Sequence, residues 1–370
     1  MQNRGFIFWS TCSFTLLMVV LQMVRPVKDD SALMAGLEIL PLLMLLSFVL
    51  LIVFSALLFH VNGKSGFYLL SVLFVFIFPI SHYLNGPLEA SLIYVLISSI
   101  SLVILTQFWR ALSECEGKSE SHVAFIIAYG SVGAILGSIL VVTLVASGFK
   151  DYLPLILNGL IVMAAASFSI AMSYAGDKVR MKTPDSYRRF DKTRYGSFLL
   201  LYSLVATYLY YQQLDIISRY ENFIEPQIVF GFRDLLISLL TLAVHHLLVK
   251  QNIKIEKHVT AIPVITASLF LLIFLSPSLI PILFAVVVFR TGNFTITKPS
   301  RELYYSIKPG MNKYKGFLDA AIYRSGDMLG ALLFAGLNSL GIGLAFKSLA
   351  IIPLVAVWYY TSKKVSVILK

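Results

Sequence analysis

Three ionisable residues stand out inside apolar stretches of the sequence, where a charged side chain is costly and needs a specific reason. They are Arg290, Arg324 and Asp327. Arg324 and Asp327 are three residues apart and would share one face of a helix, so they can form an ion pair. Arginine binds carboxylate and phosphate oxygens through paired hydrogen bonds. With one aspartate for two arginines, the pattern predicts a site for an anionic ligand.

The same residues permit a plainer interpretation. Arg324 and Asp327 can simply neutralise each other as a structural pair, and Asp319 can supply a second carboxylate for Arg290. Both interpretations stay open at this point.

Further charges lie at the ends of apolar runs. One group follows the first run and opens the second, and another ends the seventh: Arg25, Lys28, Asp29 and Asp30, and then Asp215 with Arg219. A solvated loop would explain them. The alternative is a gate, whose ion pairs form when a central cavity faces one side of the membrane and break when it faces the other.

The end of the seventh run is polar for a helix in lipid. It contains Tyr208, Tyr210 and Tyr211, followed by Gln212 and Gln213. Tyrosines are common in the interfacial belt of membrane proteins. A belt explains the glutamines less well, and they are candidates for lining a cavity that binds a polar solute.

These residues need elements that can hold them in lipid. The sequence of 370 residues is 58% hydrophobic and 13% charged, with a mean hydropathy of +0.82. This is more apolar surface than a soluble core can bury. Long unbroken apolar runs indicate helices rather than a barrel, so we expect an all-α polytopic membrane protein. The net charge of +11 resides between the runs, which argues against a nucleic-acid-binding face.

Runs of about 20 apolar residues predict about twelve spans. The first is interpreted as an uncleaved span rather than a signal peptide. The predicted ranges are 6–24, 33–59, 66–84, 89–109, 121–146, 152–175, 196–214, 227–249, 259–276, 279–296, 316–338 and 343–361.

Basic residues lie mainly in alternate loops, which by the positive-inside rule places both termini in the cytoplasm. The stretch 176–195 is a basic cytoplasmic linker between an N-terminal half of six helices, 1–175, and a C-terminal half, 196–370. This plan resembles the major facilitator superfamily, whose halves rock around a central substrate site.

Other chemistry finds little support. The two cysteines, Cys12 and Cys115, have no metal-ligand spacing and are expected to form no disulfide. Motifs for hydrolytic or zinc enzymes are missing, so we expect no enzyme activity, no catalytic residue, no metal and no cofactor. Small residues in the fifth and eleventh runs indicate close helix packing: Gly130, Gly133, Gly137, Gly326 and Gly330.

Several segments resemble the nucleotide (ATP/ADP) translocase family of plastids and obligate intracellular bacteria, in particular its shorter bacterial relatives. They are 24–30 with Glu38 and Pro41, 107–110 with the glycines of 130–137, 208–215, 298–302, 313–319 and 323–327. The resemblance runs through the whole chain. It implies a facilitator-type carrier with Arg25, Lys28 and Asp29 near one gate and Arg324 and Asp327 near the other.

The expected function is therefore secondary active transport of a small anionic metabolite, nucleotide-like or polycarboxylate. Alternatives are a carboxylate siderophore importer or exporter of the same fold, and a non-transporting membrane receptor or lipid-handling protein. Transport can be an exchange against a counter-substrate or a symport with protons, for which Asp327 or Asp215 would titrate. We expect a monomer in the bacterial cytoplasmic (inner) membrane, surrounded by lipid and without a nucleic-acid partner.

Overall fold

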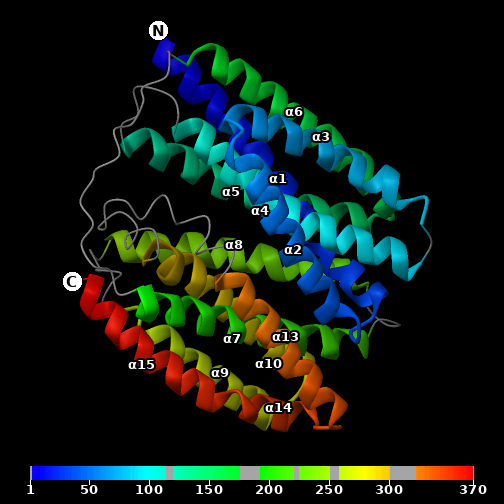
Figure 1. The fold of residues 1–370 in the computed structure, drawn as a ribbon, viewed down its shortest axis with the longest axis vertical. Coiled ribbons are helices and arrows are strands. Elements are labelled where there is room, and N and C mark those ends of the chain that lie inside the picture. Colours follow the sequence, from blue (N-terminus) through cyan, green and yellow to red (C-terminus); the bar gives the residue numbers. More distant parts are fainter. Residues whose placement is uncertain are drawn as a thin grey trace. The chain divides into compact units, whose positions relative to one another are not determined.

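The chain is built of helices (Figure 1). The structure is a computed structural model, which describes residues 2–84, 86–113, 120–175, 192–220, 225–250, 258–300 and 322–369. Within these ranges there is no β-strand. The predicted all-α fold is confirmed.

Most of the helices are long and follow one another through short connections. In the first part of the chain they are α1 (Gln2–Ala35), α2 (Leu40–Phe59), α3 (Gly63–Ser81), α4 (Pro87–Ser113), α5 (Glu120–Ala146), the short η1 (Lys150–Tyr152) and α6 (Leu153–Ser173). After residue 191 they are α7 (Lys192–Ser218), α8 (Pro226–Lys250), α9 (Ala261–Leu275), α10 (Leu279–Gly292), η3 (Asn293–Thr297), α13 (Tyr323–Ser339), α14 (Leu344–Ala350) and α15 (Ile352–Leu369).

Each of the twelve predicted ranges overlaps a helix, and α14 with α15 fills the last one. Nine segments of the described chain are long and apolar enough to cross a membrane. The other three predicted ranges hold α9, which has 15 residues, and α7 and α13, which carry the polar residues discussed above. The chain is a polytopic membrane protein. Of these three helices, α7 and α13 carry candidate site residues.

The first helix is longer than predicted. The range 6–24 was expected to end before Arg25, but α1 continues through Pro26 to Ala35. It stops at Gly36, whose φ of 99° is the left-handed conformation that commonly ends a helix. The expectation of a solvated loop at Arg25–Asp30 is therefore wrong. Charged residues can continue the helix here because Asp29 and Asp30 are buried against partners within the protein.

The chain divides into two compact units. Unit 1 comprises residues 1–36, 49–182 and 223–238, and unit 2 comprises 37–48, 183–222 and 239–370. In unit 1, α1 packs against α4, α5 and α6. In unit 2, α7 packs against α10, α13 and α15. The predicted halves 1–175 and 196–370 stay a prediction, and most of the linker 176–195 lies outside the described residues.

Aromatic side chains fill the interior of each unit. In unit 1 the rings of Phe67 and Phe168 lie 4.5 Å apart, and that of Phe108 lies 5.3 Å from Phe168. In unit 2 the ring of Tyr202 stacks on Phe289 at 5.5 Å and meets Trp358 at 5.7 Å. These large rings fix the helices that carry the polar residues.

Glycines let two helix pairs approach to backbone contact. A Cβ atom on Gly326 or Gly330 of α13 would lie 2.4 Å from the carbonyl oxygen of Leu200 or Leu204 in α7. Such a distance is impossible, so only glycine permits this approach. The close contact brings the next residue of α13, Asp327, against the polar side of α7.

The same contact recurs in unit 1. A Cβ on Gly133 or Gly137 of α5 would lie 2.4 Å from the carbonyl oxygen of Thr15 or 2.5 Å from that of Val19 in α1. In both units, two glycines four residues apart in one helix, α5 or α13, meet two carbonyls four residues apart in another, α1 or α7. The expected packing role of these glycines is confirmed, and the units share an internal repeat.

Gly326→Ala tests this packing. We expect it to lower the free energy of unfolding by about 1–3 kcal/mol, because the new methyl group overlaps the Leu200 carbonyl and α13 must move away. Thermal unfolding of the detergent-solubilised protein measures the effect. Gly336→Ala, in the same helix but with nothing within 4 Å of its new Cβ, is the matched control and should not destabilise. Equal effects of the two substitutions would contradict the contact.

Candidate functional site

A carboxylate held between two helices lies at the centre of the first candidate site. Arg324 Nη1 is 3.1 Å from Asp327 Oδ2, one turn along α13. The hydroxyls of Ser203 and Thr207 in α7 both donate to the other oxygen, Asp327 Oδ1, at 2.7 Å for Thr207. The predicted ion pair of Arg324 with Asp327 is confirmed.

The two carboxylate oxygens of Asp327 have different hydrogen-bond partners. Oδ1 takes both hydroxyls from α7, whereas Oδ2 faces Arg324. The Arg324 side chain is 21% exposed and that of Asp327 is 11% exposed. If the guanidinium turned toward another anion, Asp327 would keep two hydrogen bonds. The arrangement can therefore release an arginine from its pair without leaving a bare buried carboxylate.

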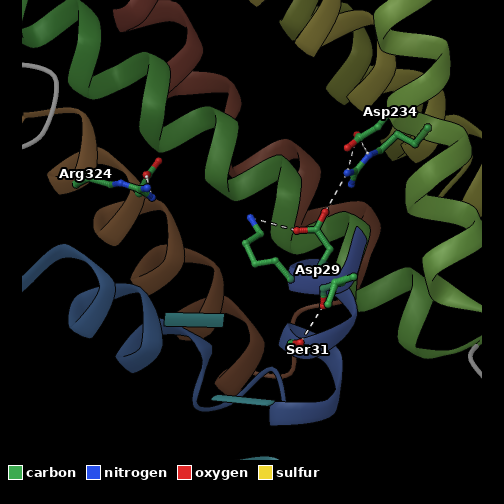
Figure 2. A network of polar contacts seen from close by, with 8 residues as sticks. Asp29, Ser31, Asp234 and Arg324 are labelled. Carbon is green, nitrogen blue, oxygen red and sulfur yellow. Dashed lines mark hydrogen bonds and ion pairs between the residues drawn. The ribbon is translucent and has the colours of Figure 1, made fainter. Parts of the chain in front are cut away.

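A second set of charges joins α1 to α8 within unit 1. Figure 2 shows Asp29 and Asp234 converging on one guanidinium, that of Arg233, with distances of 2.9 Å from Asp29 and 2.7 Å from Asp234. Lys28 Nζ approaches Asp29 at 3.2 Å. The side chains of Asp29, Arg233 and Asp234 are each 1% exposed. Buried charges persist only when paired in this way.

These four residues divide evenly between the two helices. Lys28 and Asp29 are neighbours in α1, and Arg233 and Asp234 are neighbours in α8. Each helix therefore brings one cation and one anion. Separation of α8 from α1 would break the ion pair between Asp29 and Arg233 but would leave each helix with balanced charge.

A line of polar contacts continues next to this set. Gln227 Nε2 of α8 donates to Asp30 Oδ2 at 2.7 Å. Lys150 of η1 lies 3.5 Å from Asp30 and 2.5 Å from Glu225, which precedes α8. Arg25 is half-buried and donates to Gln22 Oε1 at 2.9 Å. The first half of α8 is thus attached to unit 1 by several charged and polar side chains.

The polar end of α7 is buried, not interfacial. Tyr208, Tyr211, Gln212 and Gln213 are fully buried, and the Tyr208 hydroxyl donates to the Lys347 carbonyl at 2.7 Å. The explanation of these tyrosines as an interfacial belt is therefore wrong. Helix packing around α7 buries them, because α10, α13 and α15 surround it.

Gln212 and its neighbours form a polar cluster with α14. Gln212 Nε2 lies 3.0 Å from Ser348 Oγ. Lys347, 2% exposed, has its Nζ 2.7 Å from Asn338 Oδ1 and 3.8 Å from Asp215. Asp215 also pairs with Arg219 at 2.9 Å. The structure thus brings Asp215 to the buried Lys347 and Gln212 to the adjacent Ser348.

Both units carry an equivalent lysine–aspartate pair. Asp30 and Asp215 each come eleven residues after the second carbonyl that meets a glycine, at Val19 in α1 and Leu204 in α7. Their lysines lie 3.5 and 3.8 Å away: Lys150 is the first residue of η1, and Lys347 lies in α14. The internal repeat thus extends from backbone packing to a charged pair.

Sequence reasoning missed Arg233, Asp234 and Lys347. All three lie inside predicted spans, at 227–249 and 343–361, so the cost of a charge in lipid was a sufficient signal to find them. Arg290 lies half-buried in the last turn of α10, which packs against α7. Asp319 lies outside the described residues. Among the described residues, no group of three or more His, Cys, Asp or Glu side chains could hold a metal ion.

Comparisons with known proteins identify the fold. No protein-family model matches the chain, and no curated protein matches its sequence. A solved bacterial homologue of the iron transporter ferroportin, in an inward-facing state, is similar with a TM-score of 0.69 at 12% identity, covering 98% of both chains.

Two further solved structures are also similar to this chain. A peptide transporter in complex with sulfate has a TM-score of 0.66 at 12% identity, over 97% of this chain and 94% of that one. A nucleoside transporter has a TM-score of 0.60 at 13% identity, over 98% of both chains. At such low identity the likeness shows the fold, and the predicted major facilitator fold is confirmed.

Proposed function

We propose that this chain is a secondary active transporter that carries a small anionic metabolite across the membrane by alternating access. Its fold is shared with transporters of several solutes, among them a nucleoside transporter. The fold by itself does not specify a substrate. The charged residues inside the spans support an anionic substrate.

The observation that supports an anionic substrate is the divided bonding of Asp327. Arg324 is partly exposed and contacts Asp327 Oδ2, and two hydroxyls of α7 donate to the other oxygen, Oδ1. A phosphate or carboxylate can therefore replace Asp327 as the partner of Arg324 at little cost to the aspartate. Arg290, in the last turn of α10, which packs against α7, adds a further positive charge to unit 2.

The substrate class that we propose is a nucleotide or a polycarboxylate, including a carboxylate siderophore. The sequence resemblance to nucleotide translocases favours the former. Coupling is proposed to be exchange against a second anion, or proton symport through Asp327 or Asp215. Gln212 and Gln213, with Lys347, are proposed to bind polar groups of the solute on its way.

We propose that the ion pair between Asp29 and Arg233 belongs to a gate, with Arg25 and Lys28 beside it. The gate opens when α8 moves away from α1. Because Lys28 and Asp29 stay on one helix and Arg233 and Asp234 on the other, opening exposes two neutral pairs rather than isolated charges. The membrane is proposed to be a bacterial cytoplasmic membrane, with both termini in the cytoplasm.

Uptake of labelled ATP into intact bacterial cells that express the chain tests the proposal. Unlabelled nucleotides and citrate serve as competitors, and cells without the chain give the background. Uptake that nucleotides compete away supports a nucleotide carrier. Uptake of labelled citrate above background, without uptake of labelled ATP, indicates a polycarboxylate carrier. Equal uptake with and without the correctly inserted chain, for labelled ATP and for labelled citrate loaded on either side, contradicts the proposal.

A further inference from the structure

An open groove runs along one end of unit 2. It has a volume of about 480 Å³, and α7 and α15 form its sides. Leu200 and Leu201 come from α7, Val357 and Thr361 from α15, and Ile322 precedes α13. The lining is largely apolar, and none of the charged residues described above belongs to it. The groove is distinct from the sites around Asp327 and Lys347.

A glycine helps to keep the groove open. Gly196 lies in the groove wall, and a Cβ there would meet the Ile322 side chain at 3.2 Å. Val357 is 51% exposed and faces outward from α15. In a membrane, such an exposed apolar side chain meets lipid rather than water, so the groove is open to acyl chains.

The groove lies toward the end of unit 2 at which α7 begins and α15 ends. It uses the first turns of α7, which begins at Lys192, and the middle turns of α15, which ends at Leu369. Beyond Thr361, α15 presents Lys363 and Lys364, whose ammonium groups lie 4.9 Å from the Tyr359 ring and 4.2 Å from the Tyr360 ring. Tyrosine and lysine together are typical of the interface.

The lysines continue the line of the groove. Val357, Thr361 and Lys364 are spaced by four and then three residues, so they lie on one face of α15. Lys364 is thus one turn past the apolar wall, toward the interface. A molecule with an apolar chain in the groove would have its polar end beside this ammonium group.

We infer that this groove binds an anionic phospholipid, with one acyl chain along Leu200, Leu201 and Val357 and the headgroup phosphate at Lys364 and Lys363. Charge complementarity selects the headgroup, since a zwitterionic lipid carries a cation that offsets the attraction. Each lysine near the membrane surface contributes about a fivefold preference for anionic lipid. The inference is independent of the solute proposed above.

Native mass spectrometry of the purified full chain tests the inference. The protein is incubated with phosphatidylglycerol or with phosphatidylcholine of identical acyl chains, and retained lipid is counted. We expect preferential retention of phosphatidylglycerol, reduced about fivefold by Lys364→Gln and further by Lys363→Gln/Lys364→Gln. Lys250→Gln, at the end of α8, is the matched control and should retain the lipid.

A second variant tests the acyl chain separately. Thr361→Trp fills the groove and should reduce retention of both lipids, whereas Leu275→Trp, at a site 77% exposed in α9, should not. Equal retention of the two lipids by the unmodified chain would overturn the inference. So would a double lysine variant that retains phosphatidylglycerol normally, or a Thr361→Trp variant that loses none.

Discussion

Replacement of Arg324 by alanine is expected to reduce transport of the anionic solute at least about 100-fold. A charge-assisted hydrogen bond is worth about 1.5–3 kcal/mol, and the loss of paired bonds to phosphate or carboxylate corresponds to that range or more. Initial rates of uptake, divided by the amount of chain in the membrane, measure the effect. Insertion should be unchanged, because the basic loops that orient the chain are untouched.

The controls separate binding from packing. Arg4→Ala removes an exposed arginine at the start of α1 and should transport normally. Arg324→Lys keeps the charge but not the planar fork, and should recover only part of the activity. If Arg324→Ala/Asp327→Ala transports as well as the unmodified chain, the pair is only structural and the assignment to substrate binding fails.

Replacement of Arg233 by leucine is expected to destabilise the protein by about 3–5 kcal/mol. The substitution leaves Asp29 and Asp234, both 1% exposed, without the guanidinium they share. Asp29→Asn should cost much less, because Arg233 keeps its contact with Asp234 at 2.7 Å. Thermal unfolding in detergent, together with the amount of folded chain in the membrane, measures both.

Charge balance, rather than the shape of the site, should account for this loss. The triple variant Asp29→Asn/Arg233→Leu/Asp234→Asn removes all three buried charges and is expected to recover most of the stability. A triple variant no more stable than Arg233→Leu would show that packing around the guanidinium matters instead, including its position 5.1 Å from the Phe230 ring.

The sequence predicted the helices well because runs of about 20 apolar residues have few alternatives in lipid. The first helix was an exception. Charges at Arg25–Asp30 indicated a loop, because their partners, Gln227 and Arg233, lie about 200 positions away in the sequence. The local sequence around residues 25–30 does not reveal partners that lie so far away in the chain.

The candidate site was predictable only in part. The spacing of Arg324 and Asp327 within one helix gave their ion pair directly, whereas the hydroxyls of Ser203 and Thr207 come from another helix. The internal repeat was also not predicted from the sequence. Its helix contact uses carbonyl oxygens of α1 and α7, which any residue supplies, so at this contact only the glycines are visible in the sequence.

The backbone contact between α7 and α13 has a mechanical consequence. Two helices that touch without intervening side chains have no soft layer that permits sliding, and even small shear between them would drive Gly326 and Gly330 into carbonyl oxygens. The helices α7 and α13 are therefore expected to move as one rigid pair. Asp327 and the two hydroxyls that donate to it keep their relative positions when this helix pair moves, whereas the Arg324 side chain is 21% exposed.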